Sequence, residues 1–580
     1  MQYIKTWAVT LLAIALFACG GGGGSGGGGS SGTSTAPPPG TTSGTENEPT
    51  VTVAGATVNS QQAARFLIQA SFGPNMASID AIRNSNVESW IEREFLRTQI
   101  LHLDYVNQFP VASQSQNIFW ESFWRRAASG KDQLRQRMAF ALSQIFVISF
   151  DSDLSENIRG VASYYDMLGR DAFGNFRTLL EDVTLHPSMG TFLTHIHNQK
   201  ESGTRVPDEN YAREVMQLFT IGLYQLNLDG TIKLVGGFPV ETYTNADVSG
   251  LAKVFTGFSW GGPDKSNTRF FGGGTQDPNR DVIPMQAYPQ YHSVSAKTFL
   301  GVTISAQGTA NPTASLSVAL DTLFNHPNVG PFIGKQLIQR LVTSNPSPAY
   351  VARVASVFNN NGSGVRGDMK AVIRAILLDT EARDATTAQG NNFGKLREPV
   401  VRLGNWARAF NATSTSTRFA IGDTSNASNA LGQVPLRSPS VFNFYRPGYV
   451  PPNTNAASNG LVVPEMQITH ETSVAGYINY MQGVIPNGPS SSSGLAADRV
   501  TANYAAEIAL ADNPAQLVDR INLLLLANGM KTATRTQIIN AVGSISIPTS
   551  STSAADTARK NRVYLAIYLA MASPDYIVQK

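Results

Sequence analysis

The chain has 580 residues, of which 42% are hydrophobic and 15% charged, and its formal net charge at pH 7 is +3. From about residue 58 onward this composition is that of a soluble globular protein with room for a large core. Basic and acidic residues are interleaved, without the long cationic stripe that follows nucleic-acid phosphates, so we expect no nucleic-acid partner. Beyond the N-terminus no apolar run approaches the length of a membrane-spanning helix.

The first eighteen residues are typical of a secretory signal peptide. Lys5 precedes an apolar run from Trp7 to Ala18 that is too short to span a bilayer comfortably. The run ends in "LFAC", which resembles the lipobox of bacterial lipoproteins, and the resemblance implies cleavage before Cys19 and lipidation of Cys19. Acyl chains would then attach the mature chain to the membrane.

Cys19 is the only cysteine, so the mature chain has no intrachain disulfide even in an oxidising compartment. Gly20 follows it, where the sorting signal for inner-membrane retention has aspartate. We therefore expect an outer membrane lipoprotein that faces the periplasm or the cell surface.

Residues 19–57 are rich in Gly, Ser, Pro and Thr and contain few apolar side chains that could form a core. They predict a flexible tether, whose ends lie on the order of 30 Å apart by the relation for Gly-rich coils. The expected organisation is a signal peptide (1–18), this tether, and one helical domain (58–580).

Helical periodicity dominates that domain and predicts a mainly α fold. Ser60 is the expected cap of a helix that Gly73 and Pro74 terminate. The segment 134–149 carries an apolar stripe that includes Ile145 and Phe146. Further helices are expected after Thr244, with Asp247 three residues on, and after Ser347, with Pro348 at the first helical position.

Glycine-rich alternating segments between residues 228 and 300 predict a few short β-hairpins. The segment 436–460, with aromatic residues between prolines, is expected to be a loop folded against the helices. Two similar segments, "HPSMGTFL" at 186 and "HPNVGPFI" at 326, predict helix starts at which His186 and His326 help to satisfy free backbone amides.

The segment "PDENYAREVMQLFTIGL", residues 207–223, predicts an amphipathic helix. Tyr211 falls on its apolar face, and Glu209 and Arg213 form a solvent-exposed pair four residues apart. Asn210 and Glu214 lie at the edge of the apolar face, where a carboxylate needs a partner.

Two roles are open for Glu214. It is either a structural carboxylate bonded to an arginine or to backbone amides of a neighbouring helix, or a ligand or general base with a raised pKa. In the structural role the segment joins adjacent elements, and Glu214→Gln should then cost several kcal/mol.

The segment "THIHN" offers the ligand types that zinc prefers. If a helix continues from Pro187, however, His195 and His197 lie about 160° apart around it and cannot bind one ion. We expect histidines near a helix end, no metal and no other cofactor. The sequence also has no nucleophile elbow, phosphate loop, dinucleotide-binding fingerprint or H-E-x-x-H helix.

Several motifs together resemble DUF1800, a family of bacterial proteins of unknown function: "AARFLIQASFGP", "RQRMAFALSQIFV", "PDENYAREVMQLFTIGL", "YTNADVSGLAKVFTGF", "HSVSAKTFLG" and "HPNVGPFIGKQLIQRLV". They cover nearly all of residues 60–450. The resemblance implies an exported, largely helical protein. Such proteins are frequently encoded beside DUF1501 proteins, which are similar to the alkaline phosphatase and sulfatase superfamily.

The family's N-E-N-Y-A-R-E segment corresponds to residues 208–214 here, with Asp208 in place of the first asparagine. The family's H-D-x-G-x-K segment corresponds to His292 through Lys297, with Ser293 where aspartate is typical. His195 stands where many relatives carry asparagine. These departures fall at positions where a metal or acid/base set would lie.

From these observations we expect an accessory or binding protein of the cell envelope that works with a DUF1501-type partner. The alternative is a hydrolase that acts on an envelope or extracellular polymer. Its catalytic candidates are Glu214, Asn210 and His292.

Overall fold

The computed structural model describes residues 49–274 and 276–580. The expected signal peptide, the lipidation residue Cys19 and the expected tether as far as residue 48 therefore lie outside the described residues. At the end of that tether, Val53 N donates to Ser89 Oγ (3.0 Å) and Asn86 Nδ2 donates to Val53 O (2.9 Å).

Helices form most of the regular structure, which confirms the expected mainly α fold. The helices of the first part are α1 (Ser60–Ala70), α2 (Met76–Arg83), α3 (Val87–Leu96), α4 (His102–Val106), α5 (Gln116–Ser129), α6 (Gln133–Ser143), α7 (Ile158–Asp171), α8 (Phe176–Leu185), α9 (Pro187–Phe192), α10 (Asn210–Gln217), α11 (Asn245–Ala252) and α12 (Asn267–Phe270).

The later helices are α13 (Pro312–Asn325), α14 (Val329–Leu341), α15 (Pro348–Asn359), α16 (Met369–Leu377), α17 (Thr380–Arg383), α18 (Ala385–Gln389), α19 (Pro399–Ala409), α20 (Asn455–Ser458), α21 (Glu471–Asn487), α22 (Ala505–Ile508), α23 (Pro514–Leu526), α24 (Thr532–Gly543), α25 (Thr552–Ala572) and α26 (Pro574–Ile577). Short 3₁₀ turns are η1 (Val111–Ser113), η2 (Pro289–Tyr291), η3 (Pro464–Ile468) and η4 (Ala496–Asp498).

Within the described residues the strands form only two-stranded antiparallel sheets. Two of these sheets, at residues 234–239 and 297–304, are local hairpins of the kind expected between residues 228 and 300, although the second extends slightly beyond that range. The other two join strands that are separated by further helices. The strands are β1 (Leu234–Val235) with β2 (Phe238–Pro239), β3 (Phe258–Ser259) with β4 (Gln286–Ala287), β5 (Lys297–Phe299) with β6 (Val302–Ile304), and β7 (Lys395–Leu396) with β8 (Val578–Gln579).

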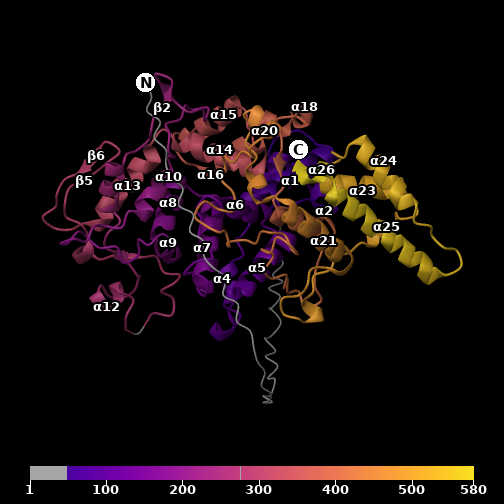
Figure 1. Cartoon of the computed structure of the whole chain (residues 1–580), viewed down its shortest axis with the longest axis horizontal. Helices are drawn as coiled ribbons and strands as arrows, with labels where there is room; N and C mark the ends of the chain where they lie inside the picture. The colour runs from indigo at the N-terminus through magenta and orange to yellow at the C-terminus, as the bar shows by residue number, and fades with distance from the viewer. Residues whose placement is uncertain (1–48, 275) are drawn as a thin grey trace, which may run out of the picture. The chain divides into compact units, whose positions relative to one another are not determined.

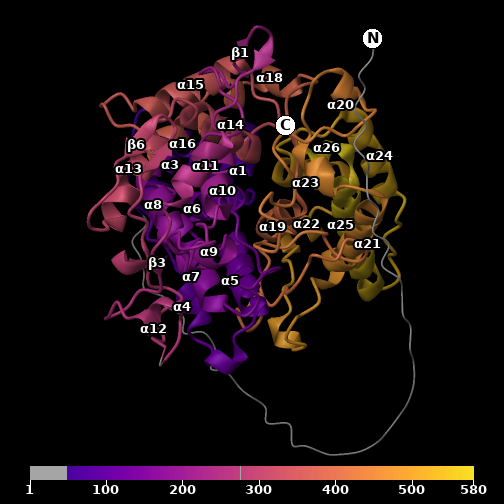
Figure 2. The ribbon, with the colours of Figure 1, turned by 60° about the vertical axis from the view of Figure 1, so that its left-hand side comes forward.

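The helices pack mainly on their neighbours in sequence, as in α14 on α15 and α24 on α25. Figure 1 shows the first helices in indigo and the last in yellow, and Figure 2 shows the elements before α18 beside those after α19. Contacts of α5 with α19 and of α1 with α23 join these two regions. One continuous hydrophobic core extends from α1 to α26.

Helix caps follow the expected chemistry with one correction. At α1 the cap is Asn59, not Ser60, because Asn59 and Gln62 each accept a hydrogen bond from the other's backbone amide (2.9 Å). Thr244 with Asp247 caps α11, and Ser347 before Pro348 caps α15, as expected.

Helix α6 is shorter than its apolar stripe predicts, since it ends at Ser143. The chain then turns, with the amides of Ile145 and Phe146 both donating to Leu142 O (2.9 and 2.8 Å). Ile145 and Phe146 are nevertheless buried, so their side chains reach the core from a turn. No helix of the described part is both long enough and apolar enough to cross a membrane.

The two similar histidine segments each contain the same kind of hydrogen bond, but only the first begins a helix at its proline. His186 Nδ1 accepts from Ser188 N and His326 Nδ1 accepts from Asn328 N, both at 3.2 Å. His186 caps α9, with Pro187 at the first helical position. Pro327, in contrast, lies in a turn, because α14 begins only at Val329.

Candidate functional site

Helix α10, which carries the "ENYARE" segment, is anchored through Tyr211. Its ring is fully buried and stacks on His195 with 3.9 Å between ring centres. The Tyr211 hydroxyl hydrogen-bonds Thr184 Oγ1 (2.7 Å), and His195 Nε2 donates to Thr184 O (2.8 Å). Tyr211 therefore fastens α10 to α8 and to the segment after α9, as the apolar-face pattern predicts.

The surface of α10 also agrees with the sequence. Arg213 Nη2 lies 3.3 Å from Glu209 Oε2, and the two side chains are 39% and 41% exposed. Glu209 accepts a second hydrogen bond from Ser249 of α11. An exposed pair of this kind contributes well under about 1 kcal/mol to stability.

Asn210, the first residue of α10, is exposed. Its backbone amide donates to Asp208 Oδ1 (2.7 Å), and its side-chain amide makes a long contact with Thr194 Oγ1 (3.4 Å). Thr194 Oγ1 also donates to Asp208 Oδ2 (2.9 Å). These bonds fix the segment before α10, beside a shallow hollow of about 600 Å³ that Thr194, Asp208 and Glu209 help to line.

Glu214 has a different environment from the one that a structural role requires. Its side chain is 8% exposed, and no hydrogen bond or ion pair reaches it from residues 49–274 or 276–580. Burial raises the pKa of its carboxyl, against the opposing effect of Arg213. Of the two roles open for Glu214, the structural one thus finds no hydrogen-bond partner for Oε2 among the described residues.

His292 is fully buried, and both ring nitrogens have partners. Nδ1 donates to Thr256 O (2.8 Å), and Nε2 accepts from Ser315 Oγ (3.1 Å). Burial lowers the pKa of His292 to about 4, so the ring is neutral at pH 7. No hydrogen bond in the described part of the chain joins His292 to Glu214 or Asn210.

Ser293, where the family has aspartate, donates to a carboxylate that comes from another segment. Glu201 Oε1 accepts hydrogen bonds from Ser293 (2.9 Å) and Ser295. Lys297 is fully buried; burial lowers its pKa, and the charge of Glu201 opposes that shift. Glu201 thus supplies the negative charge that the Ser293 position lacks.

His195 and His197 do not lie on a helix that continues from Pro187, as the sequence-based prediction assumed. Helix α9 ends at Phe192, and the backbone of Thr194 and His197 has positive φ (62° and 65°). His195 is buried under Tyr211, whereas His197 lies near Trp260. Within residues 49–580, apart from 275, no three His, Cys, Asp or Glu side chains are grouped as metal ligands.

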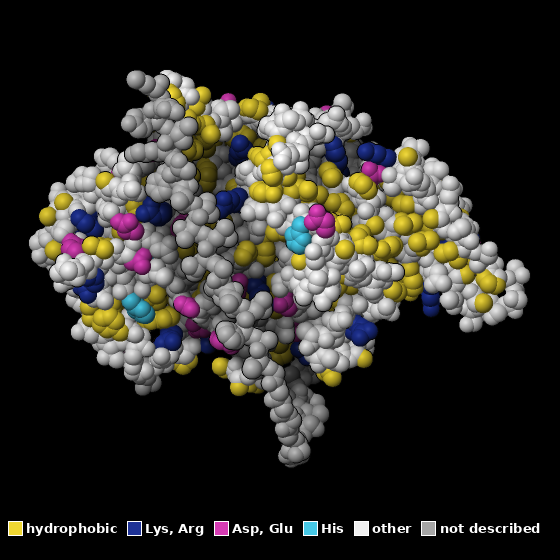
Figure 3. All heavy atoms as spheres, in the orientation of Figure 1, with side chains coloured by type: hydrophobic (Ala, Val, Ile, Leu, Met, Phe, Trp, Pro, Cys, Tyr) yellow, Lys and Arg dark blue, Asp and Glu magenta, His cyan; other side chains and the backbone are white. Residues whose placement is uncertain are grey.

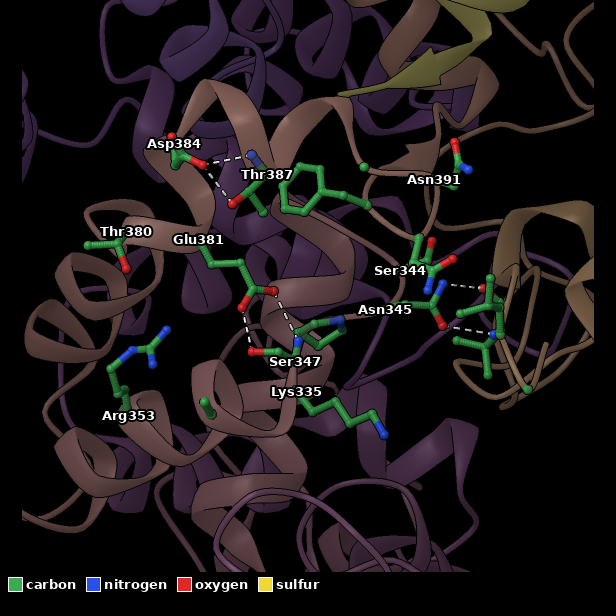
Figure 4. Close-up of a pocket in the computed structure, with 18 residues that line it drawn as sticks. Lys335, Ser344, Asn345, Ser347, Arg353, Thr380, Glu381, Asp384, Thr387 and Asn391 are labelled. Carbon is green, nitrogen blue, oxygen red and sulfur yellow. Dashed lines mark hydrogen bonds between the residues drawn. The ribbon is translucent and has the colours of Figure 1, made fainter.

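A cleft with a volume of about 1210 Å³ lies elsewhere, between the α14–α15 connection, α17, α18 and the segment 460–462 (Figure 4). Asn345 fixes one wall, because its side chain exchanges two hydrogen bonds with the backbone of Val462 (2.9 and 3.0 Å). Ser344 lies at the base: its backbone amide donates to Gly394 O, and its buried hydroxyl has no partner among the described residues.

Three of the four charged side chains of the cleft are bonded within the protein. Arg353 forms a two-pronged pair with Asp379 (2.7 and 2.8 Å). Both oxygens of Glu381 accept from Ser347, as Figure 4 shows. Hydrogen bonds from the amide and hydroxyl of Thr387 hold the pKa of exposed Asp384 below its usual range.

Lys335, the remaining charged residue of the lining, has its pKa lowered by burial, and the charge of Asp229 opposes this shift. The other polar lining residues are neutral: Ser344, Asn345, Thr380, Asn391 and Asn392. The cleft therefore offers mainly hydroxyl and amide groups to a ligand.

A buried ionic cluster adjoins the base of the cleft. Lys395, the residue after Gly394, pairs with Glu465 at 3.1 Å and also donates to Arg340 O (2.8 Å). Glu465 follows the cleft residue Val462 by three positions. Burial lowers the pKa of Lys395, and the attraction of Glu465 works against this shift.

Glu398 completes this cluster. It accepts from the side-chain amides of Gln144 (2.5 Å) and Gln433 (2.8 Å). Burial alone raises its pKa, but the charges of Lys395 and Arg137, together with these hydrogen bonds, outweigh that effect, so the pKa of Glu398 is lowered. The group is ionised and held by donors from several segments.

Sequence reasoning missed both the cleft and the cluster. Arg137 and Arg340 occur in two of the motifs quoted above. The helical periodicity of those motifs identifies their apolar faces and assigns no role to the arginines. Lys395 and Glu398 lie three residues apart, but Glu465 comes much later in the chain, and no spacing rule links it to the other two. The sequence feature that could have indicated a buried cluster is the presence of charged residues within apolar helical segments such as "LRQRMAFALSQIF".

The model of one family, described as "Protein of unknown function (DUF1800)", matches residues 65–578. The match includes α21 to α26, which follow the region of the quoted motifs. No curated protein and no solved structure matches the chain. The chain therefore belongs to the DUF1800 family, whose function is unknown.

Proposed function

We propose that this protein is a binding protein of the cell envelope whose large cleft holds a neutral, hydroxyl- and amide-rich polymer, such as a glycan strand. The expected signal peptide, lipidation at Cys19 and tether would place the domain at the outer membrane. A DUF1501-type hydrolase remains the proposed partner, on the strength of the family neighbourhood alone.

The observation that carries the proposal is the chemistry of the cleft lining. Arg353, Glu381 and Asp384 are bonded to protein groups, whereas the unpaired Ser344 hydroxyl and the exposed Asn391 and Asn392 amides are neutral. Neutral donors and acceptors suit hydroxyl and amide ligands. A volume of about 1210 Å³ accommodates several units of a polymer.

Acid–base catalysis in this cleft has little support. Glu381 has both oxygens occupied, and hydrogen bonds keep the Asp384 pKa low, so Asp384 has no proton to donate at pH 7. On the face drawn in Figure 3, basic and acidic side chains are scattered in small groups, which also suits a neutral ligand better than a polyanion.

The second candidate is the hydrolase, and the observation that favours it is Glu214. Its carboxyl is buried, has a raised pKa and leaves Oε2 without a partner among the described residues, a combination typical of functional sites. His292 supports this candidate less, because both of its nitrogens are already bonded.

Titration of the full chain with neutral hexasaccharides, one of N-acetylhexosamine and one of glucose, tests the binding proposal. Ser344→Ala should weaken binding by about 2- to 10-fold, the effect of one lost hydrogen bond. Its melting temperature should match or exceed that of the parent, because no residue of the described part of the chain bonds the hydroxyl. Ser553→Ala, at an exposed site on α25, is the matched control.

Absence of binding to both hexasaccharides would reject the proposal, and so would parental affinity in Ser344→Ala. Hydrolysis of either sugar, lost in Glu214→Gln, would instead support the second candidate.

A further inference from the structure

Exposed apolar side chains are concentrated in one short segment, residues 223–238. Seven of the sixteen large hydrophobic residues that are exposed in the described part lie there: Leu223, Tyr224, Leu228, Ile232, Leu234, Val235 and Phe238. The most exposed of these are Phe238 (76%) and Val235 (66%), on the β1–β2 hairpin. A local concentration of this kind marks an interaction site.

The hairpin tip stands clear of the rest of the protein. Gly236 and Gly237 both have positive φ (59° and 85°), as a tight two-residue turn requires, and a Cβ atom at either position would meet nothing within 4 Å. Figure 2 shows β1 at the top of the view, beyond α14 and α15.

The base of the hairpin is fixed to the preceding segment. Gln225 N donates to Val240 O (2.8 Å), and Lys233 N donates to Gln225 O (2.7 Å). The tip is therefore a stiff projection rather than a loose loop, and it can present its apolar side chains at little further cost in chain entropy.

The chemistry of the tip fits a lipid surface. No residue from Leu234 to Val240 is charged. In the β1–β2 ladder Val235 lies opposite Phe238, and Leu234 lies opposite Pro239. Pro239 has no backbone N–H that would be left without a hydrogen bond in an apolar medium. The tip is convex, so a bilayer can receive it without a matching pocket, whereas a protein partner must supply one.

We propose that the β1–β2 tip inserts Val235 and Phe238 into the same membrane leaflet that holds the N-terminal lipid. This inference rests on the proposed envelope anchoring, because the expected tether keeps the domain within on the order of 30 Å of that membrane. The hairpin supplies a second contact, and durable membrane attachment takes more than one such signal.

Tryptophan quenching in vesicles tests the insertion. The lipidated full chain carrying Phe238→Trp is reconstituted into phosphatidylethanolamine–phosphatidylglycerol vesicles with brominated acyl chains. Emission from the added tryptophan should shift to the blue and be lost to bromine. Val111→Trp, at a 75% exposed apolar position on η1, is the matched control and should show neither change.

Flotation of the parent with vesicles reports the anchor separately. If the parent floats but Phe238→Trp is not quenched, or is quenched no more than Val111→Trp, the hairpin proposal fails and the anchoring stands. If the parent does not float, both fail. If the parent forms a dimer that Phe238→Ser abolishes, and Phe238→Trp is not quenched, the tip binds a second copy of the chain and the membrane proposal fails.

Discussion

Glu214 places a carboxyl group inside the protein whose Oε2 has no hydrogen-bond donor among the described residues, with only the charge of Arg213 acting against its burial. Burial raises its pKa, so the native state holds the proton more firmly than the unfolded chain does. The contribution of this group favours folding at low pH and is lost as pH rises from the ordinary glutamate range through the raised value.

Replacement of Glu214 by Gln should therefore leave stability unchanged or increase it near pH 7, since the amide keeps the shape of the neutral acid. The gain over the parent should shrink toward about pH 4, where the parent carboxyl is itself protonated. Thermal melts of both proteins across this range measure the difference.

Glu209→Gln, on the exposed face of the same helix, is the control and should cost less than about 1 kcal/mol. A Glu214→Gln protein that melts well below the parent at neutral pH would show that Glu214 has a charged partner after all.

Among the elements, the β7–β8 ladder is joined to α14 by a buried side chain of β8. Gln579 is 1% exposed and donates from Nε2 to Leu341 O (2.8 Å) and, more weakly, to Val342 O (3.4 Å). Arg397 N donates to Ile577 O (2.8 Å) beside it. Gln579 thus joins β8 to the end of α14.

Gln579→Ala should lower the free energy of unfolding by about 1–3 kcal/mol, because it leaves buried carbonyl groups without donors. Chemical denaturation measures this change. Lys580→Ala, next to it but exposed, removes one surface hydrogen bond to Gly390 O and should cost much less. Equal effects of the two substitutions would contradict the role assigned to Gln579.

The elements that could be predicted from sequence are those set by neighbours in the chain. Thr244 with Asp247, Ser347 with Pro348, and the glycine-rich hairpins involve only a few consecutive residues. The cap at Asn59 was placed one residue late, because adjacent Asn and Ser both suit a cap and only the geometry chooses between them.

The parts that could not be predicted depend on contacts between distant segments. β7 pairs with a strand more than 180 residues away, and no local pattern specifies that partner. The expected partner of Glu214 follows only from the position of Glu214 on its helix. That position does not reveal whether the segment packed against it carries a charged side chain. Ser344 became a candidate only when the folded chain placed it at the base of a cleft.

At the scale of the whole molecule, the ionic cluster ties α14, β7 and η3 together. Lys395→Met would leave Glu465 buried without its cation and should cost about 3–5 kcal/mol. The double variant Lys395→Met, Glu465→Leu should recover part of that loss, because it removes the stranded charge as well. Denaturant unfolding of the single and double variants measures the coupling.

Arg437→Met is the control for this cycle, since it breaks an exposed ion pair with Asp423 and should cost less than about 1 kcal/mol. A double variant less stable than Lys395→Met would contradict the cluster as described.

The β7–β8 pairing also sets a time scale for synthesis. β7 emerges from the ribosome about 180 residues before β8, and at about 5–20 residues per second its partner follows on the order of 10–40 s later. During that interval the segment around Lys395 and Glu398 is made but its ladder cannot close. A chain at this stage is open to chaperones and to proteases at the place that becomes one of its most deeply buried.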